Sequence, residues 1–176
     1  MAVGGPALFL GADTPCVALL RPELDVNDPE LRLAAERAGV SAEEFAGESG
    51  VWQVMADRTD GQGRSFELPE LTDGEVAAFT EELLHALVFG DADGNGAGDG
   101  DGWSVELGTG ALLVTVRDAG DDRAALTVRV VPPAGAGTGA EAPEGPSDTG
   151  PLDVELATLP VAELRAEVAD FRRSFA

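Results

Sequence analysis

The chain has 176 residues, of which 44% are hydrophobic, and 33 acidic against 11 basic residues give a net charge of −22. This length fits a single domain over residues 1–176, and the apolar content allows a buried core, which excludes a wholly disordered chain. So negative a charge argues against binding to nucleic acid or anionic lipid, because phosphate is attracted by a basic face. It would suit a basic protein partner, which an acidic surface attracts over long range.

The composition offers a second interpretation of this acidity. All 11 basic residues are arginine, and the sequence has no lysine, isoleucine or tyrosine, which is typical of a GC-rich genome such as that of an actinobacterium. The acidity would then reflect codon bias and solubility. The single cysteine, Cys16, excludes an intrachain disulfide and suits a reducing compartment. We find no signal peptide and no apolar run of about 20 residues, and we therefore expect a cytoplasmic protein.

The first half of the chain has the less regular pattern. Apolar residues around Phe9 and at 16–20 predict two strands or one broken strand, and Asp28-Pro29 starts a short helix. Ser41 and Glu44 indicate a further helix start of the capping-box kind. Residues 51–56 and 64–68 then predict a hairpin around Asp60-Gly61.

A long amphipathic helix opens the second half. Thr72 and Glu75 have the spacing of a capping box, and Gly90 supplies a left-handed stop. Between them one apolar stripe recurs at helical spacing, at Val76, Phe79, Leu83 and Leu87.

Four segments of alternating apolar and polar residues follow, at 103–107, 111–117, 124–131 and 152–156, with a hairpin turn at 118–122. Pro160 then stands in the first turn of a closing helix with an apolar face. Strands with one apolar and one polar face are typical of an antiparallel sheet with one side in water. The expected fold is therefore α+β, an antiparallel sheet with one face packed by two amphipathic helices.

Two stretches, residues 90–102 and 134–150, are low in complexity and are expected to be flexible loops within the domain. The first resembles an EF-hand calcium loop, with candidate ligands at Asp91, Asp93, Asn95 and Asp99. Gly102 stands where a bidentate glutamate normally closes the shell, and a strand follows where the motif needs a helix. A solvated acidic loop is the alternative interpretation, and no other cofactor is indicated.

The remaining chemically suggestive residues favour structural roles. His85 lies opposite the apolar stripe of its helix and is expected at the surface, and Cys16 is expected to be an inert, buried thiol. The pair Asp121-Asp122 stands at a hairpin tip, where aspartate suits turn geometry better than acid catalysis. Trp52 and Trp103 both fall in alternating strands and are expected in the core.

The order of elements over residues 71–176 resembles that of WapI-type immunity proteins and related small uncharacterised actinobacterial domains. The resemblance is carried by the helix, the strand pair at 103–117, a strand ending Val130-Val131-Pro132-Pro133, and a last strand followed by a helix ending in phenylalanine. The aromatic residue expected after Pro133 is absent, and residues 28–50 have no counterpart. The resemblance implies a non-enzymatic protein that neutralises a toxin by covering its active surface.

Three functions follow from the sequence. The first is a binding protein of the immunity or antitoxin kind with a basic partner, which is not an enzyme and binds neither nucleic acid nor membrane. The second is a calcium-responsive module that uses the acidic loop. The third is an enzyme that uses carboxylates alone, for which no constellation of residues stands out.

Overall fold

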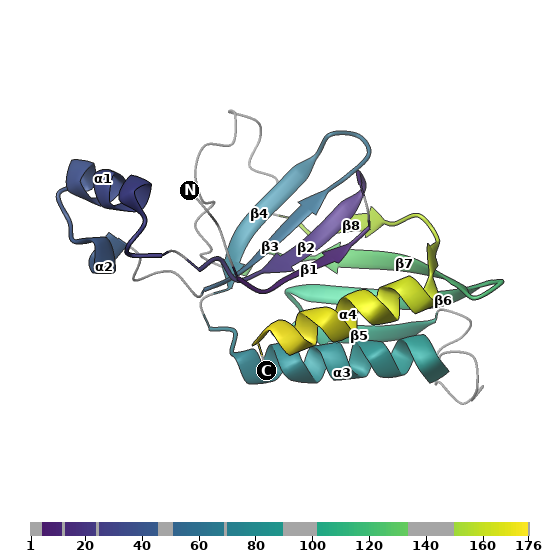
Figure 1. Cartoon of the computed structure of the whole chain (residues 1–176). Helices are drawn as coiled ribbons and strands as arrows, with labels where there is room; N and C mark the ends of the chain where they lie inside the picture. The colour runs from purple at the N-terminus through teal and green to yellow at the C-terminus, as the bar shows by residue number, and fades with distance from the viewer. Residues whose placement is uncertain are drawn as a thin grey trace.

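A computed structural model of the chain describes residues 5–11, 13–23, 25–45, 51–68, 70–89, 102–133 and 150–175. The α+β class predicted from the sequence is confirmed (Figure 1). The elements in chain order are β1 (Ala7–Leu10), β2 (Cys16–Leu20), α1 (Pro29–Ala38), α2 (Ala42–Phe45), β3 (Trp52–Asp57), β4 (Gly63–Leu68), α3 (Asp73–Phe89), β5 (Trp103–Leu107), β6 (Leu112–Gly120), β7 (Arg123–Val130), β8 (Leu152–Glu155), β9 (Leu159–Pro160) and α4 (Val161–Phe175).

The strands form two antiparallel sheets. The first has the order β1-β2-β3-β4, and the second has the order β5-β6-β7-β8, with β9 paired to β7. Sequence alternation predicted the strands of the second sheet within a few residues, and it predicted the β3–β4 hairpin. Pro160 pairs with Arg123 of β7 and therefore belongs to β9. It directly precedes Val161, the first residue of α4. The expectation that it stands inside the helix was wrong by one residue.

One hydrophobic core joins both sheets to α3 and α4. Each sheet turns its apolar face inward, and the predicted stripe of α3 is buried against them together with Leu164, Val168 and Phe171 of α4. The two helices lie side by side (Figure 1), and Arg172 of α4 forms an ion pair with Glu81 of α3 at 3.3 Å. Burial of this common core is the main stabilising contribution that the fold makes.

Local sequence signals place the start of α3 as predicted. The Glu75 backbone N–H donates to Thr72 Oγ1 at 3.3 Å, and the Thr72 backbone N–H donates to Glu75 Oε2 at 2.9 Å. These two reciprocal bonds are the predicted capping box, and they satisfy amides that a helix start otherwise leaves unpaired. The bonds from Thr72 also hold the pKa of Glu75 below its usual range.

Helices α1 and α2 form an arm that stands apart from the rest of the molecule (Figure 1). Among their residues whose burial the structure describes, none belongs to the common core. Leu31 and Ala35 are nevertheless buried, and Leu33 is exposed. The ends of the arm are capped locally: Asp28 accepts the Glu30 backbone N–H at 2.8 Å, and Ser41 Oγ accepts that of Glu44 at 3.0 Å. Both helices of the arm therefore have an N-terminal cap supplied from within the arm itself.

The tight turns of the second sheet need backbone angles that few residues adopt. Asp121 and Asp122 have φ of 54° and 57° between β6 and β7, and Thr109 has φ of 52° between Gly108 and Gly110. Two successive left-handed residues fit a two-residue hairpin turn, where aspartate is tolerated. Within the described ranges no helix is long and apolar enough to cross a membrane.

Candidate binding surface

The predicted calcium ligands Asp91, Asp93, Asn95 and Asp99 lie outside the described residues, as does nearly all of both predicted loops. Among the residues that the structure does describe, no three His, Cys, Asp or Glu side chains are grouped as a metal site would require. The calcium hypothesis therefore stays a prediction from sequence.

His85 and Trp103 contact each other at the surface. His85 is exposed, as predicted from its position opposite the apolar stripe of α3. Trp103 was expected in the core, and that expectation was wrong: its side chain is 39% exposed, with its ring centroid 5.9 Å from that of His85. Trp103 points to the same side of the sheet as the buried Val105. It is, however, the first residue of β5, and β5 is the edge strand of the second sheet. The core does not extend far enough to cover it.

Cys16 is a free thiol that is only partly buried, which corrects the expectation of full burial. Its pKa is raised, first by burial and then by the nearby carboxylates of Asp57 and Asp13. A raised pKa reduces the thiolate fraction, and the thiolate is the nucleophile. The predicted inert character therefore fits its surroundings.

Three carboxylates line a shallow hollow between the β3–β4 hairpin and β8. The hollow has a volume of about 510 Å³ and includes Asp60, Asp153 and Glu155. Asp60 already pairs with Arg58 at 3.0 Å, and Asp153 receives two bonds from Arg129 at 2.7 and 3.1 Å. These bonds hold the pKa of Asp153 below its usual range. A carboxylate so held is a poor proton donor, whereas acid catalysis needs a raised pKa.

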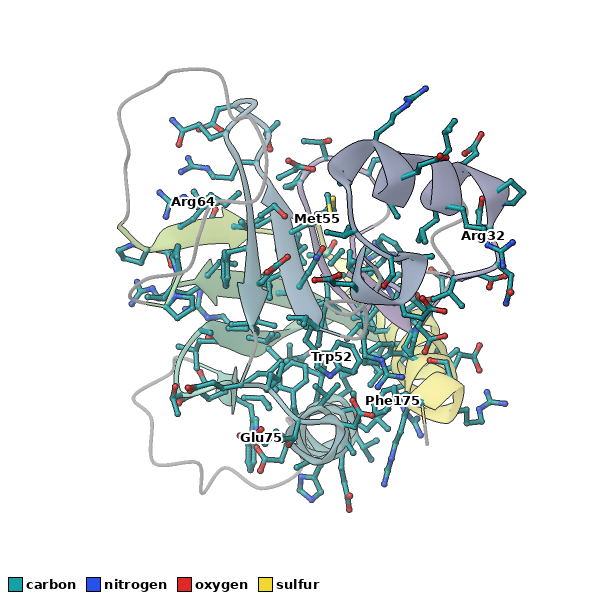
Figure 2. The ribbon with its side chains drawn as sticks, turned by 90° about the vertical axis from the view of Figure 1, so that its left-hand side faces the viewer. Arg32, Trp52, Met55, Arg64, Glu75 and Phe175 are labelled. Atoms are coloured by element: carbon teal, nitrogen blue, oxygen red, sulfur yellow. The ribbon has the colours of Figure 1, made fainter. Side chains whose placement is uncertain are left out.

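A polar cluster around Trp52 has a structural role. Trp52, whose side chain is only 1% exposed, donates its indole N–H to Asp73 Oδ1 at 3.0 Å. Arg21 donates to Asp73 Oδ2 at 2.5 Å, and its guanidinium carbon lies 5.4 Å from the Trp52 ring centroid. Phe171 and Phe175 pack edge-on against the same ring. Figure 2 labels Trp52 and Phe175 close to each other, beside the C-terminal helix. These contacts connect the first sheet to the start of α3 and to the end of α4. They also bury the Trp52 ring, so that ring is not accessible to a ligand.

The outer face of the first sheet carries two large, exposed apolar side chains, Phe9 and Met55. By register, Phe9 of β1 lies opposite Ala18 of β2, Ala18 lies opposite Met55 of β3, and Met55 lies opposite Ser65 of β4. Directly opposed residues point to the same side of a sheet, so these four form one row across the strands. Phe9 is 52% exposed and Met55 is 43% exposed, whereas Ala18 between them is only 4% exposed. We call Phe9, Ala18 and Met55 the apolar row.

A carboxylate flanks the apolar row on each side. One neighbouring row contains Leu20, Gln53 and Glu67, and the other contains Cys16, Asp57 and Gly63. Gln53 donates to Glu67 at 3.3 Å. A Cβ on Gly63 would lie 2.4 Å from Asp57 Oδ1, so the glycine leaves room for that carboxylate on the sheet surface. Among the outward residues of the four described strands, none is basic.

Sequence reasoning missed this surface, although one signal was present. In β3, Trp52, Val54 and Ala56 are buried, so Met55 occupies the polar phase of the alternation. A large apolar residue in that phase is the mark of an exposed apolar site on a sheet.

No protein-family model, curated protein or solved structure matches this chain.

Proposed function

We propose that the protein is a non-enzymatic binding domain that captures a basic protein on the outer face of the β1–β4 sheet. The observation that carries this proposal is the apolar row with a carboxylate on each side. Exposed apolar side chains beside polar groups are typical of protein interaction sites, because their burial against a partner stabilises the complex. The two carboxylates would make such a complex selective for basic partners.

The charge of the whole chain supports the same partner class. At least five of the 11 arginines already pair with carboxylates of the chain, at Arg21, Arg58, Arg129, Arg172 and Arg173. The excess of acidic residues therefore remains available to attract a basic molecule. Attraction of this kind raises the association rate and weakens as salt screens it.

The element order of residues 71–176 supports a narrower version, in which the partner is a toxin. An immunity protein of the WapI type would act by covering a toxin's active surface, and a basic nuclease-type toxin would suit a chain with a charge of −22. Likeness of architecture alone does not establish function, so binding has to be measured directly.

The test is affinity capture from the native host with tagged protein at low salt, followed by a high-salt wash. We expect one basic protein to be captured in stoichiometric amount at low salt and to be released by the high-salt wash. Its capture should be the same in the presence of calcium and in the presence of a chelator. Replacing Phe9 and Met55 together by glutamine should weaken its binding at least about tenfold, since burial of each side chain contributes of order 1 kcal/mol. Val88→Gln is the matched control, because Val88 on α3 is also 43% exposed. The proposal would be contradicted if the double variant and Val88→Gln changed the binding of this protein by the same factor.

A further inference from the structure

We propose that the partner segment bound by this face is a basic amphipathic α-helix that lies across β1, β2 and β3. The inference rests on the proposed function and specifies which structural element of the partner makes the contact. It follows from the spacing of the apolar row, the position of the carboxylates and the hydrogen bonding of the sheet.

The apolar row has the spacing of a helix surface. Neighbouring strands lie about 4.8 Å apart, so Phe9 and Met55, with one strand between them, are separated by roughly 10 Å. In a helix, residues i and i+7 lie about 10.5 Å apart along one face. A helix that crosses the strands can therefore place residues i and i+7 on Phe9 and Met55. The residue at i+3 or i+4 then lies above Ala18, whose short side chain is only 4% exposed between its two longer neighbours, so the main contacts are with Phe9 and Met55.

The carboxylates lie where the edges of such a helix would be. Residues two apart along a strand are about 6.8 Å apart, so Asp57 lies roughly that far from Met55 along β3. On the other side, Glu67 lies roughly that far along β4 from Ser65, the residue opposite Met55. A helix with side chains is about 10–12 Å across. Lysine or arginine on both borders of its apolar stripe would therefore reach Glu67 on one side and Asp57 on the other.

An extended segment would fit this face less well. The backbone N–H and C=O groups of β2 and β3 are already paired with strands on both sides. A strand laid on the face would leave its own backbone groups without partners from the protein, whereas a helix pairs them internally. A second copy of the chain is disfavoured because two molecules of charge −22 repel each other. Within the described chain, α3 and α4 pack on the opposite, core-facing side of the sheet.

The experiment uses two peptide display libraries of identical amino-acid composition, each with members of about 18 residues, or five helical turns. One library places its apolar residues three and four apart, and the other places them at every second position. Both are selected on the wild-type protein, and the enriched clones are then titrated against the Phe9→Gln, Met55→Gln double variant and against Val88→Gln. Circular dichroism of each variant confirms that it is folded.

We expect the enriched clones to come from the helical library, with lysine or arginine bordering the apolar stripe. They should bind the double variant at least about tenfold more weakly than wild type and bind Val88→Gln unchanged. Basic clones from the alternating library, or clones indifferent to the double variant, would overturn the helix inference and leave the basic-partner proposal standing. Enrichment without any basic preference, or no enrichment from either library, would overturn both.

Discussion

Asp73 is the residue whose removal best tests how the two halves of the molecule are held together. Its carboxylate accepts the indole N–H of Trp52 and the guanidinium of Arg21, and it stands at the first residue of α3. Asp73→Ala removes both bonds, while Asp73→Asn keeps an oxygen for Trp52 and removes only the charge. The pair of variants therefore separates the hydrogen bond from the ion pair.

The hydrogen bond should account for most of the effect. Trp52 is almost fully buried, and a buried donor left without an acceptor costs about 1–3 kcal/mol. The Asp73 side chain is 52% exposed, so its ion pair with Arg21 is screened by solvent and contributes about 0–1 kcal/mol. Asp73→Ala should lower the free energy of unfolding by about 1–4 kcal/mol, and Asp73→Asn by no more than about 1 kcal/mol.

Urea denaturation followed by far-ultraviolet circular dichroism measures both values. Glu82→Ala is the control, since it removes an exposed carboxylate from the same helix and should change stability by less than about 0.5 kcal/mol. Equal losses for Asp73→Ala and Asp73→Asn would refute the reasoning, because the indole bond would then contribute nothing.

The same comparison has a pH dependence with a definite sign. Hydrogen bonding from Arg21, and secondarily from Trp52, lowers the pKa of Asp73 in the folded state despite partial burial. A carboxyl group with a depressed folded pKa contributes stability that is complete above its unfolded pKa of about 3.9. That contribution is lost as the pH falls through the folded pKa. The stability difference between wild type and Asp73→Asn should therefore be constant near neutral pH and shrink below about pH 4.

Three further substitutions probe other parts of the fold by the same denaturation assay. Thr72→Ala removes the N-cap of the capping box with Glu75 and should cost about 0.5–2 kcal/mol; an unchanged midpoint would show that the cap contributes nothing. Phe171→Ala leaves a cavity beside Trp52 and should cost about 3–5 kcal/mol, and a loss below 1 kcal/mol would mean that α4 repacks. Asp122→Gly relieves a left-handed backbone and should raise stability by about 0.5–1 kcal/mol, whereas a loss would show that the aspartate side chain supports the turn.

The sequence predicted the second sheet well because each strand has one face in water. Residues such as Val114 and Val128 are buried while their neighbours Thr115 and Thr127 face outward, so the pattern repeats every two residues. The first half was harder to interpret for the same physical reason. In β1 the exposed position is occupied by Phe9, so the strand reads as a continuous apolar run rather than an alternation.

Tertiary arrangement explains what sequence could not supply. Alternation identifies a strand, but it does not say which strands share a sheet or in which register they pair. Phe9 and Met55 are far apart in sequence, and only the pairing of β1, β2 and β3 brings them into one row. The prediction that Trp103 lies in the core was wrong because the alternation of residues along a strand does not show which strand forms the edge of a sheet. Met55 alone gave a signal in the sequence, but the face that we propose as a binding site could be assembled only once the register was known.

The contrast between the two outer faces bears on whether the acidity reflects composition alone. If the acidity came from codon bias alone, carboxylates would be distributed over the outer faces of both sheets in the same way. On the second sheet, Arg129 faces outward and pairs with Asp153, so at least one carboxylate of that face has an arginine of the chain as its partner. On the first sheet, Asp57 and Glu67 lie beside exposed apolar side chains, and no arginine faces outward to balance them. Negative charge placed next to apolar surface, without internal compensation, is the arrangement that a basic partner would complete.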